Sequence, residues 1–273
     1  MAAITSVISL KGKKAIVLGG TSGIGLATCR QLVERGADVI AYSRSQEKCD
    51  AAKAELLALF AAAADSNNNS KHEKENEIRG SFTAESLDVL DRSKLEAAFI
   101  KHAGFDYLVA AATGGSRALG PFLEMDPDGF QHSFAKLWGY ANAVRFGAPR
   151  MNHTGGASIV LVSGSPARKC RPGYVALSCV GAAVENLVRA LATELSDKNM
   201  NIRINGVSPG LIDTPMFDGK GDGRAEFLAQ ATASNPIPRP GTADEVASGI
   251  LFALTNNFVT GTIIDVDGGA AVP

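Results

Sequence analysis

The stretch VLGGTSGIGLA (residues 17–27) joins an apolar run to an amphipathic one. Its glycines at positions 19, 23 and 25 allow a sharp turn that brings backbone N–H groups close to a ligand. At a helix N-terminus, those N–H groups and the helix dipole favour a phosphate. The position of the turn, directly after the first apolar run, predicts a dinucleotide diphosphate site. A plain tight turn is the alternative that this motif alone leaves open.

Apolar runs and amphipathic stretches alternate along nearly the whole chain. The runs typical of short buried strands are residues 14–20, 38–44, 106–112, 156–164, 202–210 and 261–269. The stretches typical of helices are residues 25–35, 47–64, 92–102, 128–151, 173–196 and 243–254. This alternation predicts a doubly wound α/β fold with a parallel sheet of about seven strands, in one domain over residues 1–273.

Two segments depart from the pattern. Residues 65–80 are polar and low in complexity, so they predict a mobile surface insertion, with a charged interaction patch as the alternative. Residues 210–230 are rich in glycine and charge, which is typical of a loop that covers a substrate.

The composition excludes several classes of function. A net charge of −1 gives no basic field for nucleic acid, and the four scattered histidines indicate no metal site. The four cysteines form no C-x-x-C pair, as in proteins of a reducing compartment. The N-terminal run is too short and polar for a signal peptide, and we expect no segment long and apolar enough to span a membrane. The expected location is cytoplasmic.

The turn GGTSGIG resembles the nucleotide-binding turn of the short-chain dehydrogenase/reductase family. SLDVLD (residues 86–91), SPGLIDTPM (208–216) and VDGG (266–269) follow in the family's order, so the likeness covers residues 10–269. It implies a nicotinamide cofactor, with the adenine beside 88–89 and the nicotinamide beside 208–216. The implied cofactor contacts are Gly19, Thr21, Ser22, Gly23, Ile24, Gly25, Asp88, Val89, Ala110, Ala111, Pro209, Gly210, Ile212 and Thr214.

The second predicted strand indicates which nucleotide binds. An acid after this strand would accept hydrogen bonds from the ribose of NAD and repel a 2′-phosphate. Here Ser43 and Arg44 follow the strand, and the first acid is Glu47. A hydroxyl and a guanidinium suit a phosphate, so we predict NADP(H) rather than NAD. The alternative is that Arg44 is only a solvated residue at a helix start.

The resemblance implies a catalytic tyrosine, with a lysine four residues later that favours its phenolate. In this chain Tyr174 is followed four residues later by Ser178. Counting back from LATEL (residues 191–195), the family's tyrosine position falls on Leu177 and its lysine position on Gly181. The ordinary mechanism therefore cannot be carried over.

The family's serine and asparagine positions differ as well. The serine position falls on Gly164, between Ser163 and Ser165, and the asparagine position falls on Lys136. Lys136 could supply the missing positive charge or bind a substrate oxygen, and either serine could donate to that oxygen. Tyr174 could be a displaced acid, because Pro172 suits a first helical position and would place it in the opening turn. The predicted catalytic residues are Lys136, Ser163, Ser165 and Tyr174.

Each of these residues also has a structural alternative: a lysine at a subunit contact, serines that end a strand, and a tyrosine at a helix start. The sequence favours an NADP(H)-dependent oxidoreductase acting on a small carbonyl or alcohol. A protein that binds NADP(H) without turnover and a lyase or isomerase stay open. Residues 128–151 and 173–196 carry small and apolar residues on several faces, so we expect a homodimer or homotetramer.

Overall fold

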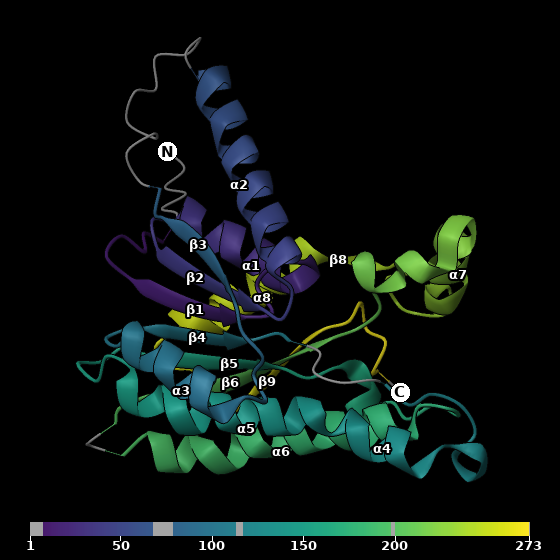
Figure 1. The fold of residues 1–273 in the computed structure, drawn as a ribbon. Helices are drawn as coiled ribbons and strands as arrows, with labels where there is room; N and C mark the ends of the chain where they lie inside the picture. Colours follow the sequence, from purple (N-terminus) through teal and green to yellow (C-terminus); the bar gives the residue numbers. More distant parts are fainter. Residues whose placement is uncertain (1–7, 68–78, 113–116, 198–199, 273) are drawn as a thin grey trace, which may run out of the picture.

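A computed structural model describes residues 8–67, 79–112, 117–197 and 200–272 (Figure 1). Its centre is a parallel sheet with the strand order β3-β2-β1-β4-β5-β6-β9. The strands are β1 (Lys14–Leu18), β2 (Asp38–Ser43), β3 (Phe82–Ser86), β4 (Tyr107–Ala110), β5 (Ser158–Val162), β6 (Arg203–Pro209) and β9 (Ile263–Val266). The order reverses between β1 and β4, where doubly wound sheets bind ligands beyond their carboxyl ends. The predicted fold class and strand number are confirmed.

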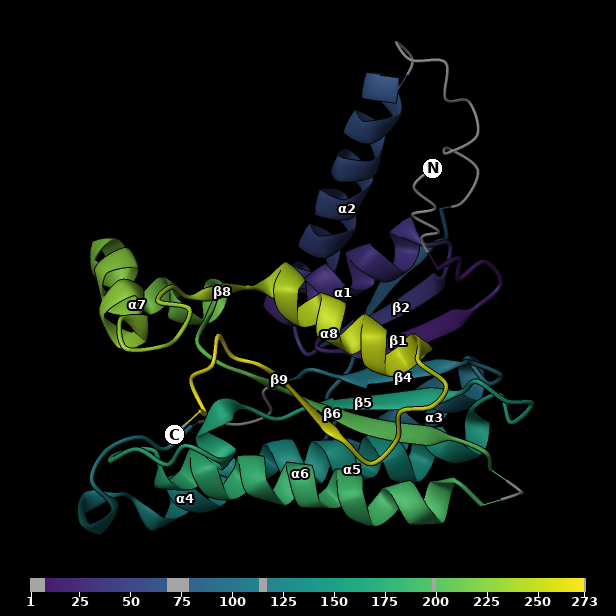
Figure 2. The same cartoon turned by 180° about the vertical axis from the view of Figure 1, so that it is seen from behind.

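Helices cover both faces of the sheet (Figures 1 and 2). One face carries α1 (Gly23–Glu34), α2 (Gln46–Asn67) and α8 (Ala243–Thr255). The other carries α3 (Arg92–Lys101), α5 (Ala135–Gly147) and α6 (Val175–Leu195). Each layer buries apolar side chains against β4 and β5, whose residues are all buried, as continuous apolar runs predict. The core thus fixes the carboxyl ends of the central strands.

Every predicted buried strand is present, but the sequence pattern missed β3. This strand lies at the sheet edge, and of its five residues only Ala84 is buried. An exposed edge strand needs no continuous apolar run, so FTAES lacks the signal that marks the central strands.

The single helix predicted over residues 128–151 is wrong. The structure has α4 (Pro127–Ser133), then α5, then the 3-10 turn η2 (Ala148–Arg150). Phe134 ends α4 and precedes α5. The Ser133 hydroxyl donates to the carbonyl of Gly129, four residues back, a bond that bends helices. After this break the first turn of α5 lies beside the carboxyl end of β5, where Lys136 contacts Ser163.

The predicted start of the next helix is also wrong. Gly173 has a φ of +80°, so the backbone turns there, and α6 begins at Val175 with Tyr174 as its N-cap. Pro172 therefore lies before the helix and not at its first position.

The expectation that no segment could span a membrane fails for α6. Its 21 residues have a mean hydropathy of 1.5 in their most apolar window, which is enough by length and composition. In this fold one side of the helix packs on the sheet, with Val184 and Val188 in the core, and 39% of that window is buried. Packing in the core therefore accounts for part of the apolar character of α6.

The two irregular segments have more helix than predicted. Residues 65–67 belong to the end of α2, while residues 68–78 of the predicted insertion lie outside the described part of the chain. Residues 210–230 contain β7 (Ile212–Asp213), the 3-10 segment η4 (Pro215–Gly223) and most of α7 (Arg224–Thr232). β7 pairs with β8 (Gly241–Thr242). The predicted covering loop is therefore largely helical.

Candidate functional site

The glycine-rich turn closes so tightly that only glycine fits at two of its positions. A Cβ on Gly19 would lie 2.6 Å from the backbone nitrogen of Ala112, and one on Gly25 only 2.0 Å from the carbonyl oxygen of Gly19. The turn leads directly into α1, whose N-cap, Ser22, makes no side-chain capping bond. The first turn of α1 also has no acid. Its N–H groups therefore remain for an anion, as a diphosphate requires.

The segment after β6 forms the opposite wall of this crevice. A Cβ on Gly23 would lie 3.3 Å from the Cβ of Thr214, so the glycine turn and the stretch containing Ile212 and Thr214 are neighbours. Pro209 ends β6, and Gly210 packs so closely on Asp267 that a Cβ there would lie 2.7 Å from its Cα. The structure thus brings the predicted diphosphate and nicotinamide contacts to one edge of the sheet.

The predicted adenosine residues meet at the same edge. Ser43 lies opposite Ser86 in the β2–β3 register, and the Ser86 hydroxyl donates to the carbonyl of Arg44. Arg44 is exposed and makes no ion pair with a described residue. Asp88 and Val89 follow β3, while Ala110 and Ala111 lie where β4 ends beside β1. These positions lie at the same carboxyl edge of the sheet as the glycine turn.

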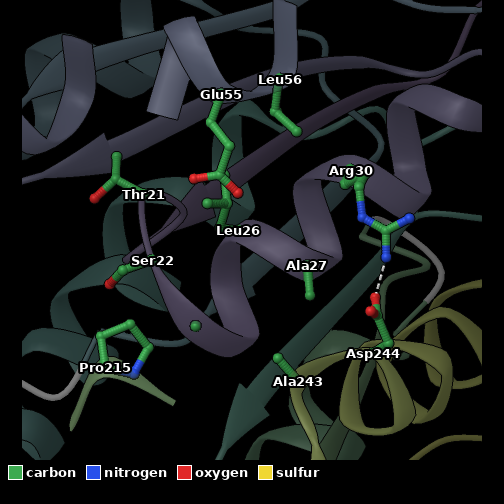
Figure 3. Close-up of a pocket in the computed structure, with 11 residues that line it drawn as sticks. Thr21, Ser22, Leu26, Ala27, Arg30, Glu55, Leu56, Pro215, Ala243 and Asp244 are labelled. Atoms are coloured by element: carbon green, nitrogen blue, oxygen red, sulfur yellow. Dashed lines mark hydrogen bonds and ion pairs between the residues drawn. The ribbon is translucent and has the colours of Figure 1, made fainter. Parts of the chain in front are cut away.

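A pocket of about 310 Å³ lies beside the glycine turn (Figure 3). It is lined by Thr21, Ser22, Gly23, Leu26, Ala27, Arg30, Glu55, Leu56, Pro215, Ala243 and Asp244. Its one arginine is already paired: Arg30 contacts Asp244 and donates to Glu34 at 2.8 Å. Arg44, rather than Arg30, is therefore the arginine with free donors for a nucleotide phosphate.

Lys136 lies in the first turn of α5 and reaches the end of β5. Its Nζ donates to the carbonyl oxygen of Ser163 at 2.9 Å and lies 5.5 Å from the ring centre of Tyr140. Burial of the ammonium, with a smaller repulsion from Arg117, lowers the pKa of Lys136 to about 8. A lysine with this pKa can give or take a proton near neutral pH.

The hydroxyl of Ser163 points away from Lys136. It donates to Oε1 of Glu185 at 3.1 Å, and Glu185 is only 3% exposed. Nε of Arg168 donates to the other oxygen of that carboxylate at 3.2 Å. Ser163 therefore presents its carbonyl to Lys136, and its hydroxyl is already engaged. Ser165, half-buried at the start of the 3-10 turn η3 (Ser165–Ala167), is the serine whose hydroxyl has no such partner.

Leu177 and Gly181, the positions that the sequence pattern matches to the family's tyrosine and lysine, carry no acid or base. Leu177 is half-buried, and Gly181 packs under η3, so that a Cβ on it would lie 2.9 Å from the Cβ of Ala167. η3 thus fills the space beside the helix where a longer side chain would stand. Tyr174 is half-buried before α6, and no contact among the described residues joins it to Lys136.

Sequence reasoning missed several residues of this site. The buried Glu185 forms an ion pair with the half-buried Arg168, and the buried hydroxyl of Tyr140 donates to the carbonyls of Ala112 and Val162. Two signals were readable in the sequence. Glu185 is the only acid in the apolar first half of α6, and Tyr140 follows Lys136 by one helical turn. Nothing in the sequence placed Arg168 beside Glu185.

Two family models match the chain. The model described as enoyl-(acyl carrier protein) reductase matches residues 50–271, and the one described as short chain dehydrogenase matches residues 13–76. The first alone covers more than half of the chain.

Known proteins match over nearly the full length. The oxidoreductase asL5 of Sarocladium schorii is 31% identical over 98% of this chain and 99% of its own. An NADPH-dependent aldehyde reductase-like chloroplastic protein of Arabidopsis thaliana is 31% identical over 96% and 95%. A short-chain oxidoreductase of Pseudomonas aeruginosa PAO1, solved with NADPH and described as containing an atypical catalytic centre, is 28% identical. It superposes with a TM-score of 0.84 over 98% of this chain and 100% of its own.

Proposed function

Because the chain belongs to the short-chain dehydrogenase/reductase family, whose fold binds a nicotinamide cofactor, we propose that it is an NADP(H)-dependent oxidoreductase with a rearranged proton-transfer site. Its substrate would be a small carbonyl compound or the corresponding alcohol. One observation carries the proposal: the ammonium of Lys136, which donates to the carbonyl of Ser163, lies at the sheet edge that also holds the glycine-rich turn. That is where a substrate beside the nicotinamide needs a proton donor.

The choice of NADP(H) rests on Arg44. Its guanidinium is exposed at the end of β2, has no acidic partner among the described residues, and adjoins the hydroxyl of Ser43. A bidentate guanidinium suits the 2′-phosphate that distinguishes NADP from NAD. The NADPH in the similar structure from P. aeruginosa supports the same choice.

A reduced nicotinamide in the crevice would supply a hydride to the carbonyl carbon, leaving the oxygen in need of one proton. In our proposal the ammonium of Lys136 donates that proton and is recharged from water, so the carbonyl becomes an alcohol. The Ser163 carbonyl orients Nζ, and Tyr140 keeps the two strand ends together. A Ser165 hydroxyl adds a second donor. Oxidation runs in reverse, with the neutral amine as the proton acceptor.

The test is a panel of aldehydes and ketones with purified protein and NADPH, following nicotinamide absorbance together with nucleotide binding. Oxidation of NADPH that requires a carbonyl supports the proposal. Tight NADPH binding with no turnover across the panel would contradict it and favour the alternative of a binding protein. That alternative rests on Leu177 and Gly181, which offer no acid or base at the family's catalytic positions.

We also propose that the chain forms a homodimer or homotetramer through α5 and α6. Trp138 on α5 is 60% exposed, a large apolar group that association would cover. Light scattering at micromolar concentration tests this, and a monomer would contradict it.

A further inference from the structure

Three acids near Lys136 and near the stretch after β6 already have cationic partners. Asp213 and Asp218, beside the second wall of the crevice, both pair with Arg224. Glu185, behind Ser163, pairs with Arg168. The charges of these carboxylates are therefore already balanced and do not neutralise other cations near Lys136.

Two cations at this end have no such partner. Lys136 makes no ion pair with a described residue, and its hydrogen bond goes to the neutral carbonyl of Ser163. Arg117 likewise forms no ion pair within the described part of the chain, and its Nη1 contacts the sulfur of Met216 at 2.7 Å. A thioether is a weak acceptor, so Arg117 keeps nearly all of its capacity to bind an anion.

Backbone hydrogen bonds place the segment after Arg117 beside the elements that carry Lys136 and Tyr174. The N–H of Ala118 donates to the Ser133 hydroxyl, one turn before Lys136, and the N–H of Gly120 donates to the carbonyl of Gly173. Residues 117–120 thus run from the start of α5 toward the start of α6, while Met216 belongs to η4. Arg117 is also near enough to Lys136 to contribute to its lowered pKa. Arg117 and Lys136 are therefore neighbouring cations.

We propose that the substrate is an oxo acid whose carboxylate is bound by Arg117 while its reacting carbonyl oxygen meets Lys136. This deepens the proposed function and rests on it. A guanidinium with free donors binds a carboxylate through two parallel hydrogen bonds. The negative charge would also repay part of the cost of burying the neighbouring ammonium. A neutral carbonyl compound would leave both cations uncompensated.

The test compares α-oxo and γ-oxo carboxylates with their methyl esters in the presence of NADPH. A charge-assisted contact predicts that kcat/KM for the acid exceeds that for its ester by about 10- to 100-fold. In Arg117→Gln this ratio should fall toward one, and Arg117→Lys should recover part of it. Arg145→Gln, the same change of charge at an exposed site on α5, should leave the ratio as it is.

Binding of the same acids to the NADPH complex, measured by calorimetry, gives a second readout. Arg117-dependent binding of acids without turnover would support the carboxylate site and contradict the proposed redox function. Turnover of acids and esters at equal kcat/KM would overturn the carboxylate site and leave the redox function standing. An Arg117→Gln variant that loses NADPH affinity instead of selectivity would also overturn it, since Arg117 would then bind the nucleotide.

Discussion

The predicted nucleotide end, at the glycine turn, and the proposed catalytic end, around Lys136, lie at the same sheet edge but depend on different parts of the chain. The nucleotide end is built from backbone, with Gly19 and Gly25 packed where no side chain fits and free N–H groups at the start of α1. The catalytic end is built from side chains that come from separate elements: Lys136, Ser163, Arg168 and Glu185. A backbone site is specified locally, whereas a side-chain site can be rebuilt by distant substitutions.

The largest expected effect concerns the buried acid of the catalytic end. Glu185→Ala would remove the carboxylate that accepts from the Ser163 hydroxyl and one of the two carboxylates that Arg168 contacts, so the free energy of unfolding should fall by about 3 kcal/mol. Glu194→Ala, at an exposed position of the same helix, should change it by less than about 0.5 kcal/mol. Chemical denaturation measures both. If both variants lost equally little free energy of unfolding, the contacts of Glu185 with Arg168 and Ser163 would not stabilise the fold.

Lys136→Met should lower turnover by about 100-fold or more, about 2.7 kcal/mol, because the proton donor is lost. The affinity for the nucleotide should barely change, which would show that nucleotide binding does not depend on Lys136. In the wild-type protein, reduction needs the protonated ammonium, so its rate should fall as pH rises through about 8, and oxidation should gain over the same range. The exposed Lys94→Met is the control. Full activity of Lys136→Met would show that Lys136 does not transfer the proton.

Arg44→Ala tests the nucleotide end. Loss of a charge-assisted contact to the 2′-phosphate should weaken NADPH relative to NADH by about 2 kcal/mol, measured by titration. The exposed Lys11→Ala, which precedes β1 at the opposite end of the sheet, should not change this preference. Equal losses for both nucleotides would contradict the choice of NADP(H).

Tyr174→Phe should have the smallest effect, less than about tenfold in turnover, because no described contact joins the phenol to Lys136. The substitution keeps the ring and removes only the hydroxyl. Steady-state kinetics with the best carbonyl substrate measure it. A loss of about 100-fold with unchanged NADPH affinity would identify Tyr174 as the displaced acid and reassign Lys136 to a supporting role.

The same contrast determines what the sequence could predict. The glycine turn and the continuous apolar runs are local signals, so the sequence predicted the fold and the place of the turn between β1 and α1. Lys136 was found only by its place in the family's order, and its partner, the carbonyl of Ser163, is 27 residues away. The pairing of Arg168 with Glu185 depends on how η3 packs on α6, which no local pattern encodes. Likewise, the helix break at Phe134 follows a hydrogen bond from the Ser133 hydroxyl to the carbonyl of Gly129. The sequence pattern predicted one continuous helix there.

The packing of η3 on Gly181 also bears on how this sequence can change. A lysine introduced at Gly181 would meet Ala167, which belongs to a turn that Arg168 ties to Glu185. A tyrosine introduced alone at Leu177 would lack the ammonium that activates it. The lysine step therefore carries a steric cost, and the tyrosine step alone brings no benefit. The packing of η3 on Gly181 therefore opposes a stepwise return to the family's residues. A designer who seeks the family's chemistry would have to rebuild η3 first.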